Sequence, residues 1–336
     1  MKIKYLFIVA LLFSALFNAC KTDVDVIAPY RETAVVYGLL DISQGIQYIK
    51  INKVFLGKGD AFAMAQNPDS SNFNPDDMNI TLDKYNGSDF IGTIILNDTI
   101  LSGGASGSFS KEKNIIYYTK ELLQENLTYK LKVENKKTGY KAESTTNVIN
   151  LLNIEGGGGD WPFVLPNNSF NPKINIRWFA QKHAKIYELI FRFQYKEFKN
   201  GGDTVYKSID WAFSPMYSSN TEGGEEMLKV VKGEEFYQFL KTVKDSYFAD
   251  NSFKRIACGG QILVTAAGEE FQIYKDLNAP YSSNFQEKPI YTNIVNGLGI
   301  FNSRVSASGI PKALSSSSIN ELVNGNYTND LGFIRQ

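Results

Sequence analysis

Cysteine and histidine are scarce in this chain of 336 residues, which has two cysteines, Cys20 and Cys258, and one histidine, His183. A single histidine excludes metal sites built from several histidines. If Cys20 is lipidated, Cys258 has no disulfide partner. Cys258 lies in the apolar, strand-like stretch Arg255–Gly259. This setting predicts a buried, inert thiol, because no basic group is evident nearby to lower its pKa.

An excess of charge of either sign is also missing. Lysine plus arginine and aspartate plus glutamate are equal, at 35 each. The chain therefore has no basic surplus that would attract phosphate backbones, and nucleic-acid binding is not expected. Its composition, 43% apolar and 21% charged, predicts a folded globular protein.

Sequence patterns of catalysis are absent. The chain has no Gly-x-Ser-x-Gly elbow, and the run Gly156–Gly159 lacks the Gly-Lys-Ser/Thr ending of a phosphate loop. The pairs Glu225-Glu226 and Glu269-Glu270 are adjacent in sequence, so they do not indicate the spaced carboxylates of a glycosidase. His183 is predicted to be a solvated turn residue between two strands. We therefore predict a protein that is not an enzyme and needs no cofactor.

The N-terminus has the features of an export signal. Lys2 and Lys4 precede Tyr5–Phe17, a nearly continuous apolar run that ends at Asn18-Ala19-Cys20. The run is shorter than the roughly 20 residues that a membrane-spanning helix needs, and it is typical of a signal peptide. A small residue before a lone cysteine resembles the lipobox of bacterial lipoproteins, although Phe17 replaces the usual leucine. The resemblance implies a signal peptide over 1–19 and lipidation of Cys20. An ordinary cleaved signal is the alternative.

The residues after Cys20 give a further hint of location. Lys21-Thr22-Asp23-Val24-Asp25 resembles the surface-export signal of Bacteroidota lipoproteins. That resemblance implies the outer face of the outer membrane. The polar stretch 20–30 is expected to be a solvated tether.

The stretch 31–152 predicts an antiparallel β-sandwich of immunoglobulin or fibronectin type. Tyr129, Leu131 and Val133 alternate with charged residues, as in a half-buried strand, and Asn135–Gly139 predicts a hairpin turn. Several short strands with turn signals between them are typical of such sandwiches. The expected strands cover residues 34–40, 47–55, 79–86, 90–96, 114–120, 129–133 and 140–148.

The polar stretch 66–77 is rich in asparagine and aspartate. Such oxygen ligands suit calcium, but two prolines and the lack of a glycine at the sixth position fit no calcium loop. A solvated loop is the prediction.

The second half predicts a β-rich α+β domain over 173–336, after a glycine-rich linker over 153–172. The stretches Ile174–Trp178, Tyr187–Tyr195 and 204–213 read as strands, because apolar and polar residues alternate. Glu234–Lys244 has the helical spacing, and a second helix is expected to begin near Gly268. A further short helix is expected at 319–323. Trp161 and Trp211 are candidate stacking residues for a ligand, although burial is the simpler expectation for both.

Several segments resemble one family. They are Val36–Leu40, Ile49–Lys53, Gly233–Tyr237, Gly268–Glu270 and, most specifically, Tyr291–Ile294 with Asn296–Phe301. They resemble the Bacteroidota lipoproteins grouped as domain of unknown function forty-two forty-nine. The resemblance implies a lipidated outer-membrane protein, often encoded beside TonB-dependent transporters. It implies no activity and no functional residues.

Two threonines are candidate O-glycosylation sites. Asp98-Thr99-Ile100 and Asp203-Thr204-Val205 resemble the acceptor pattern of the same lineage. The resemblance therefore singles out Thr99 and Thr204.

These observations are compatible with three functions. The favoured hypothesis is a lipid-anchored, surface-exposed, non-catalytic accessory or binding protein, working with a TonB-dependent transporter or another envelope complex. A protein that captures a glycan or peptide directly is the alternative. A hydrolase is the least favoured.

Overall fold

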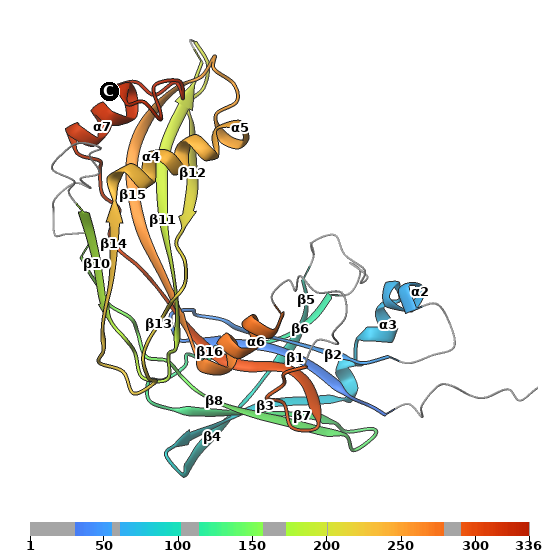
Figure 1. The fold of residues 1–336 in the computed structure, drawn as a ribbon. Coiled ribbons are helices and arrows are strands. Elements are labelled where there is room, and N and C mark those ends of the chain that lie inside the picture. Colours follow the sequence, from blue (N-terminus) through green and yellow to red (C-terminus); the bar gives the residue numbers. More distant parts are fainter. Residues whose placement is uncertain are drawn as a thin grey trace, which may run out of the picture.

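The computed structural model describes residues 31–55, 61–101, 114–156, 173–199, 201–278 and 290–335. Strands dominate these ranges and the helices are short (Figure 1). The expected fold class is confirmed: an N-terminal β-sandwich is followed by a β-rich α+β part. The predicted signal peptide and tether, 1–30, lie outside the described residues. No helix in the described ranges is long and apolar enough to span a bilayer.

The largest sheet runs through the whole molecule. It has nine strands in the order β12-β11-β15-β16-β1-β2-β6-β5, with β13 also paired to β11. The strands are β1 (Ala34–Asp41), β2 (Gln47–Lys53), β5 (Asn97–Leu101), β6 (Asn114–Thr119), β11 (Ile186–Phe198), β12 (Val205–Ala212), β13 (Met216–Tyr217), β15 (Lys254–Ala267) and β16 (Gly297–Ser308).

A four-stranded sheet completes the N-terminal sandwich. Its order is β4-β3-β7-β8. The predicted turn after Asn135 joins β7 to β8, with Gly139 in the left-handed region at φ 75°. The alternation predicted at Tyr129–Val133 is confirmed, because all three apolar side chains lie in the core that this sheet shares with β1, β2 and β6. The strands are β3 (Met78–Asn86), β4 (Asp89–Ile95), β7 (Thr128–Asn135) and β8 (Lys141–Asn147).

The C-terminal part of the chain returns to this sandwich through β16. This strand pairs in parallel with β1 over Ala34–Asp41, and then antiparallel with β15. Ile294 and Phe301 therefore join the N-terminal core, although they lie far along the chain. Gly38 in β1 makes room for them, because a Cβ there would lie 3.0 Å from the Phe301 ring. The predicted division into 31–152 and 173–336 stays a prediction.

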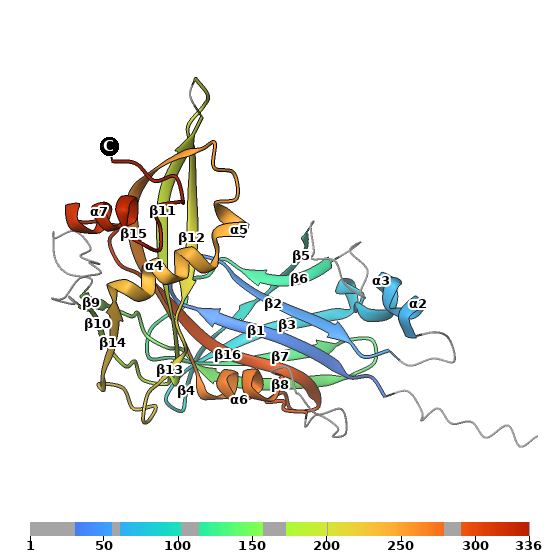
Figure 2. The same cartoon turned by 45° about the horizontal axis from the view of Figure 1, so that its top comes forward.

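The second core lies between the long strands β11 and β15 and a three-stranded sheet, β14-β10-β9. Helices α4 (Gly233–Thr242) and α7 (Ser316–Asn324) contribute Phe236, Tyr237, Leu240 and Leu322 to it, beside the single-turn helix α5 (Lys244–Tyr247). Both helices were predicted from the sequence. In Figure 2 they lie beside β11 and β15, which rise away from the N-terminal sandwich. The three small strands are β9 (Ile154–Gly156), β10 (Lys173–Phe179) and β14 (Glu226–Lys232).

Helix α6 (Glu269–Asn278) begins where the Gly268-Glu269-Glu270 signal predicted. It contacts β16 near the bend between the sandwich and the upper strands (Figures 1 and 2). Phe271 and Tyr274 of this helix face Tyr37 of β1 and Ile300 of β16 across a shared cleft. These residues point away from the N-terminal core, so α6 lies on the opposite face of the large sheet.

The solvated loop expected at 66–77 is corrected by the structure, which forms short helices there. They are α2 (Ala61–Gln66), α3 (Pro68–Ser71) and a 3-10 turn, η1 (Pro75–Asp77). The Asn67 side chain accepts a hydrogen bond from the Asp69 amide, and Pro68 occupies the first helical turn. Asparagine at the cap and proline just inside it are typical helix starts, so the residues taken as loop formers begin a helix instead.

Candidate functional site

Of the modification and stacking residues expected from the sequence, Thr99, Thr204 and Trp211 lie in the described ranges. Cys20 and Trp161 are outside the described residues. Thr99 is half-buried in the short strand β5, whereas Thr204 is exposed between β11 and β12. Trp211 is half-buried against the second core, stacked on Phe239 with ring centroids 5.6 Å apart. Among the described residues, Thr99 therefore lies at the opposite edge of the nine-stranded sheet from Thr204 and Trp211.

Cys258 is exposed, so the prediction of a buried thiol was wrong. Gln194 pairs with Gly259 and Tyr195 pairs with Ala257, which leaves Cys258 as the extra residue of a β-bulge in β15. A bulge interrupts the alternation of the strand, and it places this side chain in solvent. The alternation around Cys258 gave no sign of this insertion.

His183 lies in the predicted turn between β10 and β11, with a left-handed backbone at φ 68°. It is half-buried rather than solvated, which corrects that part of the prediction. It lines a polar pocket of about 130 Å³ together with Glu269, Glu270 and Asn302. Burial, aided by Lys182, lowers the pKa of His183. In the described part of the chain no group of histidine, cysteine and acidic residues is arranged to hold a metal ion.

The open face of the nine-stranded sheet is a candidate binding surface. We define the open face as the side opposite the two cores. Arg192 and Asp210 pair on it through two hydrogen bonds of 2.7 Å. Thr265 and Ser306 face each other across β15 and β16, with their hydroxyls 3.2 Å apart. Helix α6 contacts this face at β16. Elsewhere on the described part of the face, half-buried apolar residues such as Ile190 and Leu263 are mixed with polar ones, and tyrosines lie at one end.

A cleft opens between this face and α6. It has a volume of about 420 Å³. Apolar and aromatic side chains dominate its lining: Tyr37, Leu39, Ile46, Tyr48, Phe271, Tyr274 and Ile300. Asp41, Gln44, Gln47 and Arg304 supply most of the polar lining. We call it the tyrosine cleft.

Strand pairing explains why the tyrosines meet. Val36, Leu40, Ile49 and Ile51 enter the core, so the alternate residues Tyr37 and Tyr48 point to the open face. Tyr37 makes an edge contact with Tyr274 of α6, and Tyr48 lies beside Tyr118 of β6, both with ring centroids 6.3 Å apart. Tyr37 and Tyr48 remain 46% and 43% exposed. Four rings from three strands and one helix thus form a stripe with accessible faces.

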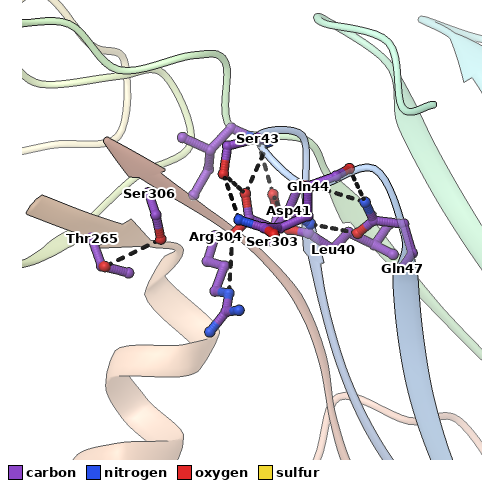
Figure 3. Close-up of polar contacts among 10 residues, drawn as sticks. Leu40, Asp41, Ser43, Gln44, Gln47, Thr265, Ser303, Arg304 and Ser306 are labelled. Atoms are coloured by element: carbon purple, nitrogen blue, oxygen red, sulfur yellow. Dashed lines mark hydrogen bonds and ion pairs between the residues drawn. The ribbon is translucent and has the colours of Figure 1, made fainter. Parts of the chain in front are cut away.

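A polar network fixes one end of the cleft (Figure 3). The Asp41 side chain is 2% exposed. Its Oδ1 accepts hydrogen bonds from the amide and the hydroxyl of Ser43, and its Oδ2 pairs with Nε of Arg304 at 3.2 Å. Gln47 Oε1 accepts from the Asp41 amide, and Gln47 Nε2 donates to the Asp41 and Gln44 carbonyls. The β1–β2 loop is therefore held in one shape by side chains.

The electrostatics of the cleft are balanced. Arg304 is paired with Asp41, and Lys275 of α6 is paired with Glu188 of β11. Burial and a hydrogen bond with Tyr37 raise the pKa of Tyr274 to about 12, so its hydroxyl stays protonated near neutral pH. The described lining of the cleft therefore presents tyrosine hydroxyls, glutamine amides and the Asp41–Arg304 ion pair.

Comparisons with known proteins add little. No family model matches the chain, and no curated protein matches it. Among solved structures, it is similar to the C-terminal globular domain of an oligosaccharyltransferase from Pyrococcus abyssi, with 10% identity and a TM-score of 0.24. The match covers 83% of this chain and 46% of that chain, so this chain spans less than half of its relative's length. A similarity this low carries no argument about function.

Proposed function

We propose that this chain is a non-catalytic binding protein, anchored in the outer membrane through lipid on Cys20 and working beside a TonB-dependent transporter or another envelope complex. The observation that carries the binding role is the open face of the nine-stranded sheet, with the tyrosine cleft at one end. Tyrosine and arginine are enriched at protein interfaces, and Tyr37, Tyr48 and Arg304 are all accessible there. The lipobox and the family resemblance support the location.

Co-purification from native membranes tests the partner. We expect gentle detergent extraction to recover the wild-type chain in a complex. Thr265→Arg places a long charged side chain in the middle of the open face and should release the partner. Thr81→Arg is the matched control, because Thr81 is also half-buried on a strand but points away from the core of the four-stranded sheet. Recovery of the wild type as an isolated monomer, or of Thr265→Arg with its partner, would contradict the proposal.

Location needs a separate experiment. Cys20→Ala should move the protein from the membrane fraction to the soluble fraction. Protease added to intact cells should degrade the wild type, while a periplasmic marker stays protected. Protection of the wild type would place it in the periplasm and remove the surface-exposed part of the proposal.

Direct capture of a glycan or peptide is the second candidate. The tyrosine cleft favours it, because its volume lies within the range of about 300–1,000 Å³ that small-ligand pockets occupy. Binding of a soluble glycan or peptide by the chain, with no protein co-purifying, would favour direct capture over the accessory role.

A further inference from the structure

We propose that the tyrosine cleft binds an uncharged sugar, presented as part of an oligosaccharide. The inference rests on the proposed binding function and names the ligand class of the same site. Its first support is the stripe of rings. Tyr37 and Tyr48 expose nearly half of their surface, while Tyr274 makes an edge contact with Tyr37 and Tyr118 lies beside Tyr48 on the next strand. An aromatic face is a flat apolar platform with a hydroxyl at its edge, and it matches the C–H face and hydroxyl rim of a sugar ring.

Charge pairing in the cleft selects an uncharged ligand. Asp41 and Arg304 are the acidic and the basic residue of the lining, and they are paired with each other. Lys50, on the same face of β2, donates to the Asn114 side chain and to the Ile115 carbonyl. A charged ligand would lose its hydration and gain no unpaired opposite charge. A neutral polar ligand avoids that cost.

The backbone of the cleft floor argues against an extended peptide. Strand β1 pairs with β2 on one side and with β16 on the other, so its amides and carbonyls are engaged within the sheet. A peptide that adds to a sheet needs a free strand edge. Here the polar groups that face the cleft are side chains, chiefly the tyrosine hydroxyls, Gln44 and Arg304. Hydroxyl groups of a sugar both donate and accept, which suits such a mixed set.

The rigid loop adds preorganisation. The hydrogen bonds of Asp41, Ser43 and Gln47 fix the loop that carries Gln44 and Ile46 into the cleft wall. A wall that is already ordered loses little conformational entropy when a ligand binds. We therefore expect binding to need no large rearrangement of β1 and β2.

Titration of the full chain in detergent tests the ligand class. The neutral probes are a glycan array, maltoheptaose and cellohexaose. An oligogalacturonate is the charged sugar probe, and a proline-rich decapeptide is the peptide probe. At least one neutral glycan should bind, with an affinity that changes less than twofold between low and high salt. Tyr48→Ala and Tyr37→Ala should each weaken that binding at least tenfold, whereas Tyr48→Phe should keep it within about threefold. Tyr206→Ala is the matched control, because Tyr206 is 76% exposed on the distant strand β12.

The sugar assignment is overturned if no neutral glycan binds, if only the oligogalacturonate or the peptide binds, or if Tyr48→Ala binds like wild type while its circular dichroism is unchanged. Co-purification separates this failure from failure of the proposed function. A chain that keeps its membrane partner but binds no sugar refutes only the ligand class. A chain that binds sugar but recovers no partner refutes the accessory role and retains the ligand class.

Discussion

At the scale of single residues, Arg255 is the most consequential side chain in the second core. It is 1% exposed, and its guanidinium donates to Glu197 Oε2 at 3.2 Å, to the Leu331 carbonyl at 2.8 Å and to the Asp250 carbonyl at 3.1 Å. One side chain therefore ties β15 to β11 and to the C-terminal segment. Removing one partner of a buried pair leaves the other charge uncompensated.

We predict that Arg255→Met lowers the free energy of unfolding by about 3–5 kcal/mol, because Glu197 loses its buried partner and the Leu331 and Asp250 carbonyls lose their donor. Urea unfolding followed by fluorescence measures the change. Lys207 also pairs with Glu197 but is 44% exposed, so Lys207→Met should cost no more than about 1 kcal/mol. Adding Glu197→Gln to Arg255→Met should recover part of the loss. If Arg255→Met and Lys207→Met lower the free energy of unfolding equally, burial of the Arg255–Glu197 pair does not decide the stability.

At the scale of elements, the pairing of β16 with β1 depends on a glycine. Gly299 has φ 100°, and a Cβ there would lie 2.0 Å from the Val36 carbonyl oxygen. Side-chain hydrogen bonds also hold the segment that precedes β16. Asn293 accepts from the Phe301 amide and donates to its carbonyl, and Asn296 donates to the Lys141 carbonyl. The most specific stretch of the family resemblance thus has a structural role.

Gly299→Ala is expected to destabilise the protein by about 1–3 kcal/mol from backbone strain alone, with a further loss from the displaced Val36 carbonyl. Thermal unfolding followed by circular dichroism detects it as a lower melting temperature. Gly45→Ala serves as the control, because a Cβ at Gly45 meets no atom within 4 Å. If Gly299→Ala and Gly45→Ala have the same melting temperature, the close approach of β16 to β1 does not limit stability.

The strands that were predicted correctly show a clear alternation of apolar and polar residues. The alternation in Tyr129–Val133 and Tyr187–Tyr195 predicted β7 and β11, because one face of each strand packs on a core. Strand β5 was missed because four of its five residues are exposed, which leaves no alternation to read. The pairing of β16 with β1 joins residues more than 250 positions apart, and no local pattern carries that information.

The tyrosine cleft was also missed, although part of its signal is local. Tyr48 and Lys50 alternate with the buried Ile49 and Ile51, which marks Tyr48 as the outward residue of a half-buried strand. Tyr48 lines the same cleft as Tyr274 only because α6 packs on β16, and that packing is a tertiary contact. The sequence thus indicated an exposed ring, and only the fold shows that it lines a cleft.

At the scale of the whole molecule, the two cores are linked by β16. Phe301 of this strand lies in the N-terminal core, together with Ile294 just before it, while Val305 of the strand lies in the second core. Strand β1 therefore has a neighbour on both sides only when the C-terminal part of the chain is present. Without β16, the edge of β1 and the pocket for Phe301 would be open to water, which costs both backbone hydrogen bonds and apolar burial.

We therefore predict that a chain ending at residue 152 does not fold on its own. It should lack a cooperative thermal transition and show poor dispersion in amide NMR spectra, whereas the chain over 31–336 should unfold cooperatively. Joining residues 290–303 to residue 152 through a flexible glycine-serine linker restores the parallel partner of β1, and it should recover dispersed spectra. Phe301→Ala in that linked chain should undo the recovery, because burying this ring in the N-terminal core is part of what the segment contributes. Cooperative unfolding of the short chain alone would instead mean that the first 152 residues carry a complete core and that β16 only docks onto it.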